Sequence, residues 1–198
     1  MSEVANSAME SVSKSGESNY LSTVKILAIS GSLRSGSSNT ALLRAMAALA
    51  PANVEIQVYE GVADLPHFSP EIDDEASPSA VVDLRAQLHA ADAVILCTPE
   101  YIHGMPGSLK NLLDWTASSG DFVDKPVAAL SASPSYAGGE KAHASLVSTL
   151  KVLSAKVVEE ASLIVPAIRK KVNANGEITD PQLEQELRSV LAALERVL

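Results

Sequence analysis

The segment SGSLRSGSSN, residues Ser30 to Asn39, gathers glycines and polar side chains that are suited to holding an anion. Gly31 and Gly36 have the spacing of a triphosphate-binding loop, but Ser37 stands where such a loop has its lysine. What remains is a set of backbone N–H groups, the Arg34 guanidinium, and the polar side chains of Ser32, Ser37, Ser38 and Asn39. This donor set suits a single terminal phosphate at a helix N-terminus. The alternative is a serine-rich turn that only caps a helix.

A second segment, PEYIHGMPG, follows the apolar run AVILCT, which is typical of a buried strand. Pro99 and Tyr101 offer flat apolar surface at its start. Backbone N–H groups from Glu100 to Ile102 could bond to the rim of a planar heteroaromatic ring. The segment therefore predicts a platform for a flat ligand, and the alternative is that Tyr101 only packs on Trp115.

A third segment, SPSYAGG, spans residues Ser133 to Gly139. Its serines could donate to ring oxygens, and its glycines let the backbone approach a ligand closely. A phosphate cradle combined with a flat apolar platform suggests a nucleotide-like cofactor with a planar ring. Flavin mononucleotide (FMN) is the cofactor that fits this description.

Short apolar runs alternate with amphipathic stretches of helical period between these segments. The predicted strands span residues 23–30, 54–60, 93–98 and 126–132, with a last strand inside 156–165. The predicted helices span residues 39–50, 79–91, 106–118, 138–155 and 180–198. We expect Asn39 and Asp180 to act as helix caps, and Pro106 to fall in a first turn, where proline is tolerated.

Five strands alternating with five helices predict a parallel sheet covered on both faces, because parallel strands need crossover connections. The expected fold is the flavodoxin-like, doubly wound α/β fold with strand order 2-1-3-4-5. In such sheets, ligands bind beyond the carboxyl ends of the strands, where the winding direction reverses. The three segments follow strands one, three and four, so the topology predicts that they meet at one edge.

The 198 residues are expected to form one domain over 23–198, after an N-terminal tail over 1–22 that is predicted to be disordered. The formal net charge of −9 argues against a broad nucleic-acid or anionic-membrane surface. The short basic run IRKK, residues 168–171, is interpreted as a solvated end of a loop. The single cysteine, Cys97, excludes an intramolecular disulfide, and the four histidines lack metal-ligand spacing. With no signal-peptide pattern or membrane-length apolar stretch, a cytoplasmic protein is expected.

The segments GSLRSGSSN, PEYIHGMPGSLKNLLDW and SASPSYAGGEKAH resemble the three signatures of the NADPH-dependent FMN reductase family, which includes bacterial quinone, chromate and azo-dye reductases. The resemblance runs from about Val24 to Val165. It implies non-covalently bound FMN, NADPH or NADH as electron donor, and a homodimer or homotetramer. The cofactor-binding residues that it implies in the first two segments are Ser32, Leu33, Arg34, Ser37, Ser38, Asn39, Pro99, Glu100, Tyr101 and Ile102.

Two details accompany this resemblance. Ile102 stands where many members of the family have asparagine, so a contact there would use the backbone. The third segment offers Ser131, Ser133 or Ser135 as its contact, and Ser133 is the candidate.

The resemblance implies ping-pong chemistry, in which FMN takes a hydride from the nicotinamide and then reduces an acceptor. Quinones, chromate, azo compounds and ferric chelates are candidate acceptors. No catalytic side chain is then required, because the cofactor carries the chemistry. Two alternatives remain: a flavodoxin-type FMN electron carrier without nicotinamide turnover, and a flavin-free interaction or regulatory domain.

Overall fold

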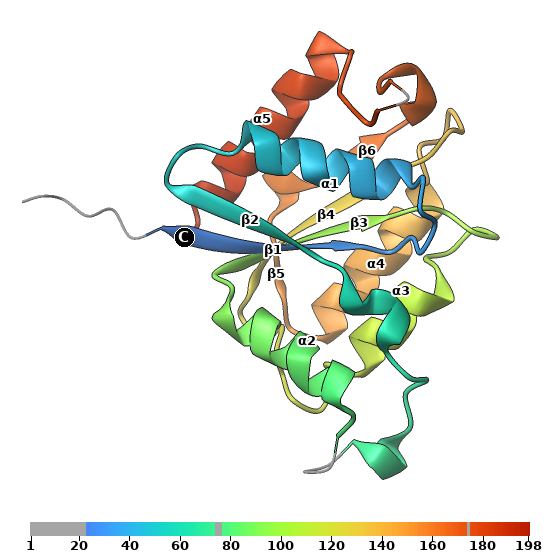
Figure 1. Cartoon of the computed structure of the whole chain (residues 1–198), viewed down its shortest axis with the longest axis vertical. Helices are drawn as coiled ribbons and strands as arrows, with labels where there is room; N and C mark the ends of the chain where they lie inside the picture. Colours follow the sequence, from blue (N-terminus) through green and yellow to red (C-terminus); the bar gives the residue numbers. More distant parts are fainter. Residues whose placement is uncertain (1–22, 74–76, 174) are drawn as a thin grey trace, which may run out of the picture.

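The protein is a three-layer α/β/α structure in the computed structural model, which describes residues 23–73, 77–173 and 175–198 (Figure 1). The sequence-predicted tail, residues 1–22, lies outside the described residues. The strands are β1 (Val24–Ser30), β2 (Val54–Tyr59), β3 (Ala93–Thr98), β4 (Pro126–Ala132), β5 (Lys156–Val157) and β6 (Leu163–Val165). The helices are α1 (Ser38–Leu49), α2 (Ser79–Ala90), α3 (Gly107–Asp114), α4 (Glu140–Val152) and α5 (Pro181–Glu195).

The sheet is parallel, with the order β2-β1-β3-β4-β5, and β6 also pairs with β4. The predicted strand order is therefore confirmed. The predicted last strand is divided: β5 and β6 are two short pieces that both pair with β4, and the short 3₁₀ helix Glu159–Ala161 separates them. The interruption falls at Glu159 and Glu160, the polar residues between the two apolar pieces of this segment.

Two apolar clusters hold the helices on opposite faces of the sheet. One cluster joins α1 and α5 to the sheet, and the other joins α2, α3 and α4 to its other face (Figure 1). The central strand β3 is buried along its whole length, as expected of a strand that both helical layers cover. Burial on both faces explains why AVILCT is a continuous apolar run rather than an alternating one.

Three helix starts differ from the sequence prediction. The N-cap of α1 is Ser37, whose hydroxyl accepts from Thr40 N–H, and Asn39 lies inside the first turn. Helix α4 begins at Glu140 because Gly138 and Gly139 take left-handed conformations, with φ of 65° and 86°. Helix α3 starts after Pro106, which is its N-cap residue, and ends at Asp114, so it is shorter than predicted. The predicted Asp180 cap of α5 is confirmed, since Asp180 accepts from Gln182 N–H.

Within the described ranges, no helix is long and apolar enough to cross a bilayer.

Candidate cofactor site

The three segments singled out in the sequence converge on one pocket at the carboxyl edge of the sheet. The pocket has a cavity volume of about 90 Å³ and opens to the surface. Its wall is formed by Ser32, Arg34, Gly36, Ser37, Ser38, Asn39, Pro99, Glu100, Tyr101, Ala132, Ser133, Pro134 and Arg169. The strand order explains this convergence, because β1, β3 and β4 are neighbours and the three segments follow their carboxyl ends.

Serine hydroxyls on the pocket wall are oriented by backbone N–H groups. Ser32 Oγ accepts from Arg34 N–H at 3.4 Å, and Ser37 Oγ accepts from Thr40 N–H at 3.3 Å. Ser133 Oγ accepts from Ser135 N–H at 3.2 Å. Each of these oxygens already accepts a hydrogen bond, so its own O–H hydrogen remains free to donate. The pocket thus presents neutral donors to an anion.

The first turn of α1 adds backbone donors to the same wall. In the described part of the chain, the N–H groups of Ser38 and Asn39 have no protein acceptor, as is usual at a helix start. Both residues line the pocket. The positive end of the helix dipole favours an anion at this position.

The side chain of Asn39 connects α1 to the two central strands. Asn39 Nδ2 donates to the Ala132 carbonyl at 3.1 Å, and Asn39 Oδ1 accepts from Cys97 Sγ at 3.0 Å. Asn39 is only 4% exposed. Its amide therefore fixes the position of the first turn relative to β3 and β4, in addition to lining the pocket. Burial raises the pKa of the Cys97 thiol, so this group stays protonated and serves as a donor.

The carboxylate of Glu100 is bound by the N-terminus of α4. Glu100 Oε2 accepts from Lys141 N–H at 2.9 Å and from Ala142 N–H at 3.1 Å. Glu100 Oε1 lies 3.7 Å from His103 Nδ1. The two backbone N–H groups and the helix dipole compensate its negative charge. Glu100 therefore borders the pocket while its carboxylate is held by α4.

Ile102 and His103 form a strained turn beside the pocket. Tyr101 N–H donates to the Gly104 carbonyl at 3.0 Å, and Gly104 N–H donates back at 3.2 Å. The two residues between them have φ of 49° and 59°, as in a type I′ turn. This conformation favours Asn-Gly, and a β-branched residue such as Ile102 is rarely found there. Ile102 is 100% exposed and does not line the pocket.

Leu33 is the other sequence-predicted residue that does not line this pocket. It is exposed and lines a neighbouring hollow on the other side of the first loop, against Tyr59 and Val62. The ring that packs against Trp115 is Phe68 rather than Tyr101. The two rings meet edge-on, with 5.1 Å between their centroids.

The third segment reaches the pocket through Ser133. Ser131 is fully buried and donates its hydroxyl to the Gly138 carbonyl at 2.9 Å. Ser135 Oγ accepts from Ala137 N–H at 3.2 Å, and this residue does not line the pocket. Of the three serines considered from the sequence, Ser133 alone lines it.

Arg169 also lines the pocket, although its position in the sequence does not indicate this. The run IRKK, expected to be a solvated end of a loop, has members in different environments. Ile168 is buried, and Arg169 lines the pocket. Lys170 Nζ donates to Tyr136 Oη at 3.1 Å, and Lys171 Nζ lies 3.6 Å from Asp180 Oδ2. Nothing in the local sequence marks Arg169, because its place depends on how β6 pairs with β4.

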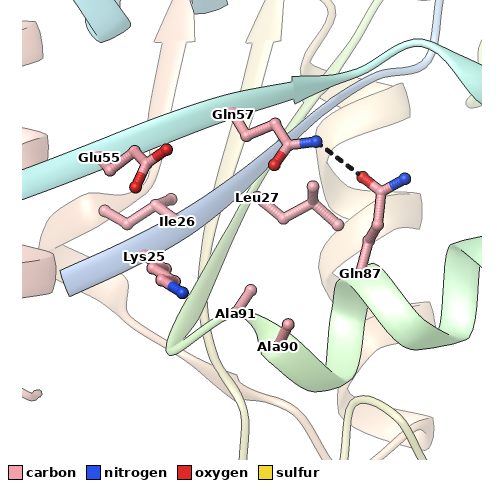
Figure 2. Close-up of a pocket in the computed structure, with 8 residues that line it drawn as sticks. All are labelled: Lys25, Ile26, Leu27, Glu55, Gln57, Gln87, Ala90 and Ala91. Carbon is pink, nitrogen blue, oxygen red and sulfur yellow. Dashed lines mark hydrogen bonds between the residues drawn. The ribbon is translucent and has the colours of Figure 1, made fainter. Parts of the chain in front are cut away.

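A second hollow, with a cavity volume of about 170 Å³, lies at the amino end of the sheet between β1, β2 and α2 (Figure 2). Gln57 Nε2 donates to Gln87 Oε1 across it at 3.1 Å. Its other lining residues are Lys25, Ile26, Leu27, Glu55, Ala90 and Ala91. Among the described residues, no group of three or more His, Cys, Asp or Glu side chains is placed to hold a metal ion.

The sequence of this chain is similar to those of known reductases. The family model for NADPH-dependent FMN reductases matches residues 24–170. An NAD(P)H-dependent FMN reductase of Pseudomonas aeruginosa is 33% identical over 174 residues, which covers 87% of this chain and 94% of that protein. A quinone reductase of Escherichia coli K12 is 32% identical over 174 residues, which covers 86% of this chain and 93% of that protein.

Solved structures show the same architecture. The flavoenzyme NAD(P)H:acceptor oxidoreductase FerB of Paracoccus denitrificans aligns with a TM-score of 0.76 at 25% identity, covering 87% of this chain and 98% of that one. An archaeal flavodoxin aligns with a TM-score of 0.60 at 15% identity, covering 88% of this chain and 99% of that one, which shows the fold alone. The match of the family model over most of the chain, on the residues that build this pocket, establishes that the chain belongs to the NADPH-dependent FMN reductase family.

Proposed function

We propose that this protein uses bound FMN to reduce a quinone with electrons from NADPH or NADH, in two alternating half-reactions. The observation that carries the proposal is the convergence of three loops on one pocket at the carboxyl edge. One wall offers anion donors and another offers flat apolar surface. A phosphorylated planar cofactor requires both, and the family to which the chain belongs supplies the chemistry.

The donor set fits the monophosphate of FMN. Arg34 supplies charge, Ser32 and Ser37 supply hydroxyl hydrogens, and the first turn of α1 supplies backbone N–H groups. The lysine that holds the outer phosphates of a nucleoside triphosphate is missing. The donors are mostly neutral, so they can hold one phosphate inside a protein with a net charge of −9.

The opposite wall would border the isoalloxazine ring. Pro99 and Tyr101 present apolar surface, and Tyr101 is half exposed, which leaves the mouth open to a second planar molecule. When bound, FMN supplies hydride acceptance from a nicotinamide and two-electron delivery to an acceptor. The contribution of the chain is position and electrostatics: the phosphate loop anchors one end, and the Pro99–Tyr101 segment fixes the plane of the other.

An open mouth also favours acceptors of several shapes. A flat quinone would lie on the same exposed ring face as the nicotinamide, which is why the donor must leave first. Chromate, azo compounds and ferric chelates are secondary acceptors under the same proposal. The proposal also includes assembly as a homodimer or homotetramer. Analytical ultracentrifugation of the purified protein would measure this oligomeric state.

A spectroscopic experiment tests the proposal directly. The purified protein is loaded with FMN and mixed anaerobically with NADPH, and in parallel with NADH. We expect the flavin absorbance to bleach, and to return when a benzoquinone is added. Steady-state rates at several quinone concentrations should give parallel double-reciprocal lines. A bound flavin that neither nicotinamide reduces would identify an electron carrier instead, and a protein that takes up no FMN would refute any flavin chemistry.

A further inference from the structure

The segment after β6 supplies a fourth wall to the pocket and is fixed to the third loop by backbone hydrogen bonds. Ser133 N–H donates to the Val165 carbonyl at 3.2 Å, and Ile168 N–H donates to the Ser133 carbonyl at 3.1 Å. Ala167 N–H donates to the Ser135 carbonyl at 3.0 Å. The fully buried Ile168 anchors the segment from inside. The backbone that carries Arg169 therefore has a fixed place on the pocket wall.

Among the residues that the structure describes, the Arg169 side chain has no hydrogen-bond or ion-pair partner. Within residues 23–73, 77–173 and 175–198, neither Arg34 nor Arg169 forms a side-chain hydrogen bond or an ion pair. The next two basic residues differ, because Lys170 Nζ donates to Tyr136 Oη at 3.1 Å and Lys171 Nζ lies 3.6 Å from Asp180 Oδ2. In this basic run, both lysines therefore have a side-chain partner, whereas Arg169 has none among the described residues. Of the three, only Arg169 lines the pocket.

The charge balance of the pocket wall is positive. Arg34 and Arg169 are its two cations, and Glu100 is its one carboxylate among the lining residues. Two backbone N–H groups of α4 bind the Glu100 carboxylate at 2.9 and 3.1 Å, and within the described residues it forms no ion pair with either arginine. Two unpaired guanidinium groups on one small pocket suit a ligand group that carries nearly two negative charges. A phosphate monoester carries about −1.5 to −2 at neutral pH.

We propose that Arg169 is a second arginine for the phosphate of FMN, facing Arg34 and the serine donors from the third-loop side of the pocket. This proposal rests on the proposed function, because it assumes that FMN is the ligand. The planar guanidinium forms two parallel hydrogen bonds to a phosphate, which suits it to this role better than lysine. Arg169 is not part of the phosphate-loop motif, because it lies far beyond Arg34 in the sequence.

The experiment compares FMN with riboflavin, which lacks the phosphate and keeps the ring. Flavin is removed from the purified protein, and both compounds are titrated by quenching of flavin fluorescence. We expect Arg169→Ala to raise the dissociation constant of FMN about 10- to 100-fold. The constant for riboflavin should change by less than about 3-fold, because a residue that binds only the phosphate cannot affect a ligand without one.

Lys170→Ala is the matched control. It removes one positive charge from the adjacent residue, whose ammonium group is engaged by Tyr136. We expect its FMN constant to stay within about 3-fold of the wild-type value. Arg169→Lys should recover part of the lost affinity, because it restores the charge without the two parallel hydrogen bonds. Melting curves of each variant check that the fold is intact.

The outcomes separate this proposal from the proposed function. A wild-type protein that binds neither flavin would refute both. If the wild type binds FMN and Arg169→Ala binds it equally well, the arginine proposal fails and the proposed function stands. The arginine proposal also fails if Arg169→Ala weakens FMN and riboflavin to the same extent. A variant with unchanged FMN affinity that raises KM for NADPH but not for NADH would overturn it too, by assigning Arg169 to the electron donor.

Discussion

The two ends of the sheet each carry a hollow, and they differ in the balance of the charges that line it. At the amino end, one cation and one carboxylate, Lys25 and Glu55, line the hollow, and Gln57 and Gln87 bond to each other across it (Figure 2). At the carboxyl end, by contrast, two cations, Arg34 and Arg169, line the pocket with one carboxylate. Backbone N–H groups of α4 bind that carboxylate, which belongs to Glu100. The carboxyl end is therefore the one whose positive charge exceeds its negative charge, which favours an anionic ligand.

This difference shows that volume is a poor guide to function in this molecule. The amino-end hollow has a cavity volume of about 170 Å³ and the carboxyl-end pocket about 90 Å³, so the larger space is not the one that favours an anion. The geometry of the chain explains the difference between the two ends. Parallel strands direct the loops that follow them to one edge, where helix N-termini also gather. The amino end of the same sheet receives helix C-termini such as that of α2, which do not favour anions.

Removing the charge of Arg34 tests the contrast most strongly. We expect Arg34→Ala to raise the dissociation constant of FMN about 10- to 100-fold, because a hydrogen bond to a charged group contributes roughly 1.5–3 kcal/mol. Lys25→Ala removes the same charge from the amino-end hollow and should leave FMN binding unchanged. Fluorescence titration measures both constants. Equal effects at the two ends would show that the overall charge of the protein, rather than this pocket, governs binding.

The hydrogen bonds of Asn39 provide the next test, on stability. We expect Asn39→Ala to lower the free energy of unfolding by about 1–3 kcal/mol, because it leaves the buried Ala132 carbonyl without its side-chain donor. Asn53→Ala is the control at the amino end, where Asn53 Nδ2 donates to Glu195 Oε1 at 3.0 Å in a partly buried setting. Urea unfolding compares them, and a larger loss for Asn53→Ala would contradict the assignment of Asn39 as the more important connection.

Tyr59 has a buried hydroxyl without a partner in the described residues, and it does not line the cofactor pocket. It ends β2 and is 4% exposed, and in the described part of the chain its hydroxyl has no hydrogen-bond partner. Burial, followed by the charges of Asp83 and Asp64, raises its pKa to about 12. The unfolded chain releases this proton near pH 10. The contribution to stability is therefore complete below about pH 10 and is lost as the pH rises through about 12.

Unfolding measured from pH 9 to pH 12 checks this expectation for Tyr59. We expect a fall in stability of roughly 1–3 kcal/mol from this group. Tyr59→Phe should remove that part of the pH dependence. It should also be neutral or stabilising at pH 7, because it deletes a hydroxyl that has no partner. A variant that loses FMN affinity while it stays folded would instead place the hydroxyl in the cofactor site.

The smallest effect concerns strain in the turn beside the pocket. Ile102 has a φ of 49°, which a β-branched residue tolerates poorly. We expect Ile102→Asn to stabilise the protein by about 0.5–1 kcal/mol, since asparagine adopts this conformation more readily. Val123→Asn is the control, at an exposed valine outside the left-handed region. Urea unfolding that showed no gain for Ile102→Asn, or an equal gain for Val123→Asn, would argue against strain at this turn.

The sequence was informative wherever local pattern determines structure. Short apolar runs, and the period-two alternation of residues 54–60, predict the strands, and their alternation with helical segments predicts the strand order. Glycine, serine and proline marked the loops that follow β1, β3 and β4. Because the topology of parallel sheets is restrictive, these local signals were enough to place the three loops together.

Features that depend on contacts between residues far apart in the chain could not be predicted from the sequence. Arg169 belongs to the pocket because Ser133 and Val165 are hydrogen-bonded, and nothing near Arg169 in the sequence reports that bond. The Glu100 carboxylate turns to α4 because Gly138 and Gly139 delay the helix start. The N-cap of α1 is Ser37 rather than the predicted Asn39, because several consecutive residues in that loop are of types that cap helices well.

The long-range hydrogen bonds of the Asn39 side chain affect the order in which the site can form during synthesis of the chain. Its partners, Cys97 and Ala132, are 58 and 93 residues further along. The first loop therefore cannot take its final form until β4 has been made, and the wall that carries Arg169 follows later still. By then only α5 remains to be added. On the proposed function, flavin binding would therefore follow translation of nearly the whole domain, and a truncated product ending before β4 would lack the pocket wall that Ala132, Ser133 and Arg169 form.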